Sequence, residues 1–136
     1  MQKMDNRNFT ALPVYQKSLV VKDLSDAIAN YFSYDSDFFV LNRKSSLRTD
    51  IAKALLTDAS LISATLVKAS SSKSRTVRTK NIVFINIMTR NILSYCNGLE
   101  KDGVKEKEYL NLLRKEIKTF RAYFKQWRKS LLFGEE

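Results

Sequence analysis

The sequence predicts an all-α fold, an up-down-up-down antiparallel four-helix bundle. Its 136 residues include only three Gly and one Pro, which is too few for the many turns of a β-sandwich or barrel. Hydrophobic residues make up 44% of the chain, enough for the core of one domain over residues 1–136 with short flexible termini. Apolar residues recur every three or four positions in four segments, which indicates helices at about 13–32, 47–69, 76–99 and 104–131.

The first predicted helix opens at Pro13, because the N–H that proline lacks is not needed in a first helical turn. The helical spacing is lost from Tyr34 to Ser46, so we expect a connection there. The Asp35-Ser36-Asp37 carboxylates in it can contact a divalent cation, but such residues act more often in turns and caps, and we expect no metal site. The apolar run 38–41 is expected to fold over the bundle end or to meet a neighbouring subunit.

The second predicted helix follows Ser45 or Ser46, either of which is suited to cap its N-terminus. Asp58 falls at the edge of its apolar stripe and therefore needs a partner. A cation, or a Ser, Thr or Asn from a facing helix, would satisfy this carboxylate. We expect a structural role for Asp58 rather than catalysis.

A basic turn separates the second and third predicted helices. Serines fill it between five cations, with no acid among them: Lys68, Lys73, Arg75, Arg78 and Lys80. It fits a solvated connection, a phosphate-binding corner or a membrane-surface patch. We favour phosphate, because two arginines lie one turn apart at the start of a helix, where backbone amides also attract anions. No glycine-rich phosphate loop is present, so nucleotide hydrolysis has no support.

The third predicted helix is apolar on more sides than a monomeric bundle requires, which suggests a subunit interface. Asn97-Gly98 is expected to end it, and Asp102-Gly103 to form the turn. The fourth carries a continuous apolar seam at alternating spacings of three and four from Leu110 to Leu131. Five seam positions are each followed by a cation, which predicts a basic stripe beside the seam: Arg114, Lys118, Arg121, Lys125 and Arg128. The aromatic rings between these cations belong to the seam, so we expect core packing rather than base stacking.

Charge and composition limit the classes of partner and of site that this chain can have. The net charge is +10 and its excess lies in residues 68–136, which points to nucleic acid or an anionic membrane as a partner. The chain has one Cys and no His, so an intramolecular disulfide, a zinc site built from a thiolate cluster and a Ser–His–Asp triad are excluded, and we expect no cofactor. The first residues lack a signal-like apolar core and no segment is long enough to cross a bilayer, so a cytoplasmic protein is expected.

Three segments resemble a known family of small four-helix bundles. They are Leu12-Pro13-Val14-Tyr15-Gln16-Lys17, the stretch from Leu47 to Arg75, and Gln126-Trp127-Arg128-Lys129-Ser130. The family contains the accessory variability determinant proteins of diversity-generating retroelements and the related large-subunit rRNA intervening-sequence proteins. The resemblance implies a homopentamer with a positive surface that binds RNA or DNA and docks onto a reverse transcriptase. By this resemblance, the matching basic positions are Lys73, Arg75, Arg78 and Lys80.

The leading prediction is a non-enzymatic accessory protein that binds the phosphates of RNA or DNA through these four cations and the stripe on the fourth helix. An rRNA intervening-sequence-type protein, or a protein scaffold without a reverse transcriptase client, is the alternative. Membrane binding ranks lower, because the apolar residues are committed to the core. An enzyme ranks last, with Asp50 and Asp58, or Asp35 and Asp37, as the carboxylate pairs to test.

Overall fold

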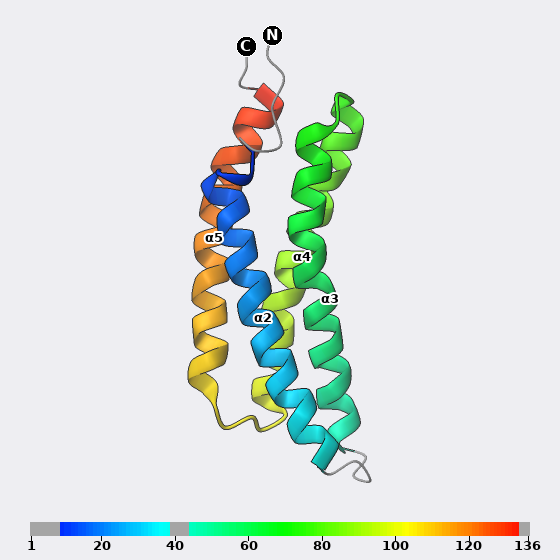
Figure 1. Ribbon diagram of the computed structural model, residues 1–136, viewed down its shortest axis with the longest axis vertical. Coiled ribbons are helices and arrows are strands. Elements are labelled where there is room, and N and C mark those ends of the chain that lie inside the picture. Colours follow the sequence, from blue (N-terminus) through cyan, green and yellow to red (C-terminus); the bar gives the residue numbers. More distant parts are fainter. Residues whose placement is uncertain (1–8, 39–43, 134–136) are drawn as a thin grey trace.

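The computed structural model describes the backbone of residues 9–38 and 44–133, and the side chains of 9–32 and 47–133. This part of the chain forms four long antiparallel helices (Figure 1): α2 (Pro13–Phe38), α3 (Lys44–Ser71), α4 (Arg75–Lys101) and α5 (Lys107–Phe133). Each packs mainly on two neighbours, so that α2, α3, α4 and α5 form a closed ring. The turn between α3 and α4 lies at the same end of the bundle as the end of α5 (Figure 1). The predicted fold class is confirmed.

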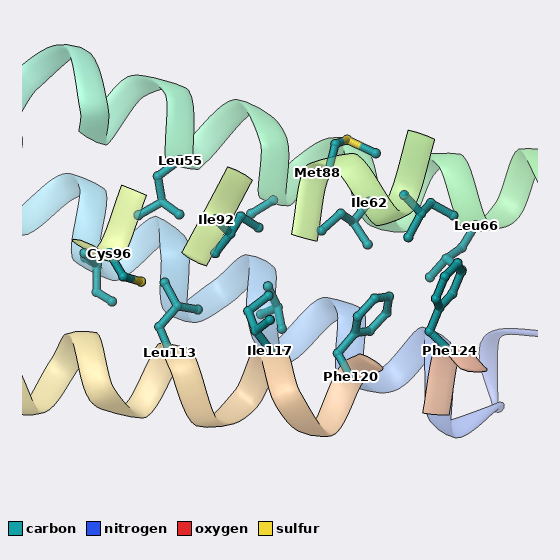
Figure 2. Packing of buried hydrophobic residues seen from close by; sticks show 14 of the residues in the cluster. Leu55, Ile62, Leu66, Met88, Ile92, Cys96, Leu113, Ile117, Phe120 and Phe124 are labelled. Atoms are coloured by element: carbon teal, nitrogen blue, oxygen red, sulfur yellow. The ribbon is translucent and has the colours of Figure 1, made fainter. Parts of the chain in front are cut away.

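The core is built from one stripe of each helix. On α5 the predicted seam is confirmed, since its residues from Leu110 to Phe124 are at most 2% exposed and Trp127 is 9% exposed. The rings of Phe120 and Phe124 stack with their centroids 5.7 Å apart. Figure 2 shows these side chains pointing at residues of α3 and α4 that are equally buried: Leu55, Ile62, Leu66, Met88, Ile92 and Cys96.

The predicted connection between the first two helices is too long. α2 continues through Tyr34 to Phe38, and α3 already begins at Lys44, so Ser45 and Ser46 lie inside α3 rather than at its cap. The reason is that this segment contains neither Gly nor Pro. Asp and Ser lower helix propensity by less than about 1 kcal/mol each, and extending an existing helix costs less than starting a new one. Residues 39–41 of the apolar run lie outside the described residues.

The predicted stop at Gly98 is also wrong, because α4 continues to Lys101. A Cβ at Gly98 would lie 3.2 Å from Cδ1 of Ile51, so this glycine permits close packing of α4 on α3. The turn is made by Gly103, as predicted, and its φ of 93° favours glycine. The N–H of Val104 then donates to the carbonyl of Leu99 at 3.2 Å, which closes the end of α4.

None of the helices in the described residues is long and apolar enough to cross a membrane.

Candidate nucleic-acid interface

The contacts of Arg114 fix the direction that the basic stripe of α5 faces. Its Nη2 donates to Oε1 of Glu100 and to Oδ1 of Asn97 on α4, both at 2.7 Å. The other stripe residues follow Arg114 at spacings of three and four, so they lie on the same flank of α5. The stripe therefore runs along the side of α5 that borders α4.

The facing flank of α4 can be traced in the same way. Arg90, Thr79 and Arg75 precede Asn97 by 7, 18 and 22 residues, which are close to whole numbers of helical turns, so they lie on the same flank of α4. At the start of α4 the guanidinium of Arg75 lies 5.6 Å from the ring centroid of Phe133, the last residue of α5. The two helices are thus in contact at both ends of a surface that we call the α4/α5 face: Arg75 and Arg90 of α4, and Lys118, Arg121, Lys125 and Arg128 of α5.

Most cations of the α4/α5 face are not neutralised. The ion pairs among the residues that the structure describes use other cations: Lys17, Arg48, Lys107 and Arg114. Lys118, Arg121 and Lys125 are exposed, and Arg128 is half-buried. Arg114 differs from them, because Glu100 compensates its charge. The structure therefore makes Arg114 a link between helices and leaves the rest of the stripe open to an external anion.

Acidic residues are absent from long stretches of both helices. The sequence contains no Asp or Glu between Asp58 and Glu100, or between Glu116 and Glu135. Because α3, α4 and α5 are antiparallel, these acid-free stretches lie side by side at the end that holds the α3–α4 turn (Figure 1). Glu100, Asp102 and Glu106 lie toward the opposite end. Among the described residues, positive charge is therefore concentrated at the end of the bundle that holds the α3–α4 turn.

The α3–α4 turn is short and stabilised by its own serines. Oγ of Ser72 accepts a hydrogen bond from the N–H of Ser74 at 3.1 Å. Ser74 is the N-cap of α4, and its Oγ accepts from the N–H of Val77 at 3.2 Å. Lys73 and Arg75 are exposed on this turn. The predicted phosphate-binding corner therefore has the expected cations at a capped helix N-terminus.

The structure separates the four predicted cations of this corner. Lys80 comes five residues after Arg75, roughly 140° around the helix, and lies on the flank toward α3 instead of the α4/α5 face. Arg78, the second arginine of the predicted corner, is less exposed than Arg75. Its Nε is buried and has no hydrogen-bond partner among the described residues. The cause is its position one turn before Ile82, a core residue that is 5% exposed.

One cation of this surface is missing from the sequence-based prediction. Arg90 is exposed and lies seven residues before Asn97, which contacts Arg114. The seven-residue spacing between Arg90 and Asn97 can be read from the sequence. It assigns Arg90 to this surface only once the side of α4 that faces α5 is known. The expectation for the aromatic rings is confirmed, since Phe120 and Trp127 are buried in the core.

Asp58 has the structural role that we expected. Its Oδ2 accepts hydrogen bonds from the Nδ2 of Asn91 at 3.2 Å and from the hydroxyl of Tyr95 at 2.9 Å, both on α4. Burial, and then the neighbouring Asp58 carboxylate, raise the pKa of Tyr95 to about 12. No group of three or more metal-ligating side chains occurs among the described residues. Asp35 and Asp37 lie in the part of α2 whose side chains are not described.

Fold and surface together define the class of this protein as a basic four-helix bundle, with no acid among the described residues of α4 and α5 at the end that holds the α3–α4 turn. Comparison of the chain with protein-family models, with curated proteins and with solved structures found no match.

Proposed function

We propose that this chain is a non-enzymatic nucleic-acid-binding protein, and that its α4/α5 face holds the phosphate backbone of RNA or DNA. The observation that carries the proposal is the row of cations on α5 that have no ion-pair partner among the described residues, beside the acid-free stretch of α4. From Lys118 to Arg128 this row is roughly 15 Å long at about 1.5 Å per residue. Arg75 and Arg90 form a second row on the neighbouring helix.

The geometry favours a backbone of fixed shape over unstacked bases. Two parallel rows of cations on packed helices, whose axes lie about 8–10 Å apart, can contact two lines of phosphates. Binding of single strands commonly uses exposed aromatic rings on which bases stack. Of the rings of α5 near these cations, Phe120, Phe124 and Trp127 are buried instead, and Phe133, which is 72% exposed, lies against the guanidinium of Arg75. We therefore expect RNA or DNA duplexes to bind more tightly than single strands of the same length.

Fluorescence anisotropy with labelled duplexes over a range of salt concentrations tests this proposal. Each phosphate contact contributes about −0.9 to the slope of log K against log salt on a DNA duplex. The double variant Arg121→Gln/Lys125→Gln should weaken binding at every sequence and reduce the magnitude of the slope by about 2. The matched control is Lys53→Gln/Lys105→Gln, which removes the same charge from exposed positions outside the face. Affinity that does not change with salt, or an equal loss in both variants, would reject the proposal.

The resemblance described above supports a more specific proposal for the client. A diversity-generating retroelement would supply a reverse transcriptase and its template RNA as partners, and the chain would assemble as a homopentamer. Sedimentation velocity measures the subunit number, and co-purification with the polymerase after nuclease treatment measures direct protein contact. Loss of the complex with nuclease would favour the rRNA intervening-sequence alternative, in which RNA alone is the partner.

A further inference from the structure

A second surface lies on the exposed side of α4 and borders the α4/α5 face at Arg90. Val83, Phe84 and Ile87 are 52%, 43% and 42% exposed, and Leu61 of α3 is 38% exposed. We call these four residues the α3/α4 patch. The core-facing side of α4 is complete without them, since its apolar residues are at most 5% exposed: Ile82, Ile85, Met88, Ile92, Cys96 and Leu99. Packing in the core of this chain therefore does not explain why these four exposed residues are apolar.

The hydrogen bond between Asp58 and Asn91 shows that the four residues are neighbours. It joins α3 and α4 at one level, with the Nδ2 of Asn91 3.2 Å from Oδ2 of Asp58. Leu61 lies three residues beyond Asp58, and Ile87 lies four residues before Asn91. Because the helices are antiparallel, both steps lead one turn in the same direction, toward the α3–α4 turn. Phe84 and Val83 precede Ile87 by three and four residues, so they lie one further turn toward the α3–α4 turn.

The surroundings of the patch are basic. Lys68 lies two turns beyond Leu61 on α3, Lys80 lies two turns before Ile87 on α4, and Arg90 follows Ile87 by three residues. All three are exposed and none forms an ion pair with a described residue. Asp58 is the acid at the edge of the patch, and its carboxylate already accepts two hydrogen bonds. An occupant of the patch thus meets apolar side chains in the centre and positive charge around them.

A second copy of this chain docked through the same patch fits these charges poorly. In a twofold dimer the same surface occurs on both subunits, so each set of cations would face its own equivalent. Like charges in such an arrangement oppose association. A segment with acids beside an apolar stripe has the complementary pattern, and an amphipathic helix presents such a stripe at spacings of three and four.

We propose that the α3/α4 patch is a docking site for an amphipathic helix of a partner protein, with an apolar stripe flanked by acidic residues. Phe84 and Ile87 would contact the stripe, and Lys68, Lys80 and Arg90 would face the acids. The site shares Arg90 with the α4/α5 face but includes none of the cations of α5. This inference does not depend on the nucleic-acid proposal, because its apolar side chains and its probe are different.

The test uses a labelled synthetic helical peptide with Leu at positions i, i+3, i+4 and i+7 and Glu on both sides of the stripe. Anisotropy should show saturable binding to the full chain, and a peptide with Lys in place of Glu should not bind. The variant Phe84→Ser/Ile87→Ser should weaken binding about tenfold or more. The control Tyr109→Ser/Leu112→Ser removes apolar residues that are 49% and 43% exposed on α5, and should change binding by less than about twofold.

Three results would overturn the proposal. An equal loss in the α5 control would mean that the peptide binds exposed apolar surface without preference. Loss of peptide binding in Arg121→Gln/Lys125→Gln would mean that the acids are captured by the α4/α5 face. Self-association in sedimentation that the Phe84→Ser/Ile87→Ser variant abolishes would assign the patch to a second copy. Amide chemical shifts of the unsubstituted chain provide a readout that needs no variant, with the largest changes expected at Leu61, Val83 and Ile87.

Discussion

Glu100 of α4 holds the guanidinium of Arg114 on α5 at 2.7 Å, at the end of the basic stripe that lies farthest from the α3–α4 turn. Asn97 and Asn111 accept further hydrogen bonds from the same guanidinium. The stripe is therefore divided in function although its residues look equivalent in the sequence. Arg114 joins two helices, and Lys118, one turn on, is exposed and unpaired among the described residues.

The first prediction separates these two roles. Arg114→Gln should lower the free energy of unfolding by about 1–2 kcal/mol, because it breaks a partly buried charged hydrogen-bond network. Lys118→Gln should change it by less than about 0.5 kcal/mol, since its side chain is exposed. The effects on nucleic-acid binding should be reversed, with the salt slope reduced by about 1 for Lys118→Gln and unchanged for Arg114→Gln. Urea titration and anisotropy measure the two quantities, and equal effects of both variants on either one would contradict the division.

The second prediction concerns two adjacent leucines of α5. Leu113 is fully buried and points into the core shown in Figure 2, whereas Leu112 is 43% exposed. Leu113→Ala should destabilise the chain by about 2–5 kcal/mol, through lost burial and the cavity left behind. Leu112→Ala should cost less than about 0.5 kcal/mol. Urea unfolding compares them, and similar costs would mean that the seam is placed one residue out of phase.

The third prediction tests the close approach at Gly98. Gly98→Ala places a Cβ 3.2 Å from Cδ1 of Ile51, the mobile end of a half-buried side chain. The gain in helix propensity, about 1 kcal/mol, should roughly balance the small shift of Ile51. Gly98→Val adds two methyl groups at the same contact and should destabilise by about 1–3 kcal/mol. Thermal unfolding of both variants distinguishes packing from helix termination. If valine were tolerated as well as alanine, α4 and α3 would not be in close contact here.

The fourth prediction is a pH dependence from the pair formed by Tyr95 and Asp58. Burial and the adjacent carboxylate raise the pKa of Tyr95 to about 12, against an ordinary value near 10. The protonated hydroxyl stabilises the folded state fully below pH of about 10. Between about pH 10 and pH 12 the unfolded chain ionises first, so this contribution is lost as the pH rises. Urea unfolding of the wild type and of Tyr95→Phe should therefore differ by about 1–2 kcal/mol at neutral pH and converge in alkali. A difference independent of pH would show that the hydroxyl is not held by Asp58.

The fifth prediction uses the single cysteine. Burial raises the pKa of the Cys96 thiol to about 11, with a smaller opposing effect from Arg114. Because the thiolate is the reactive form, alkylation in the folded chain should be slow at neutral pH and should accelerate on unfolding in urea. Mass spectrometry after a timed iodoacetamide pulse measures the modified fraction. Rapid alkylation without denaturant would contradict a closed core around Cys96.

The seam on α5 could be predicted closely from the sequence, because burial of one helix face imposes a period that apolar residues reveal on their own. The helix ends were less predictable. Gly98 is compatible with either a stop or a close helix contact, and only the position of Ile51 decides between them. The residue types of segment 34–38 favour neither helix nor loop strongly, and the segment is helical because it continues α2.

The sequence by itself determined that there are four long helices, that residues 59–99 and 117–134 contain no acid, and that cations accompany the seam. Only the tertiary structure decided which cations share a surface. It placed Arg75 and Arg90 beside the stripe of α5, turned Lys80 toward α3 and drew Arg78 partly inward. The physical reason is that helical periodicity fixes the angles between residues on one helix, whereas the rotation of that helix toward its neighbours depends on contacts such as Arg114 with Glu100 and Asp58 with Asn91.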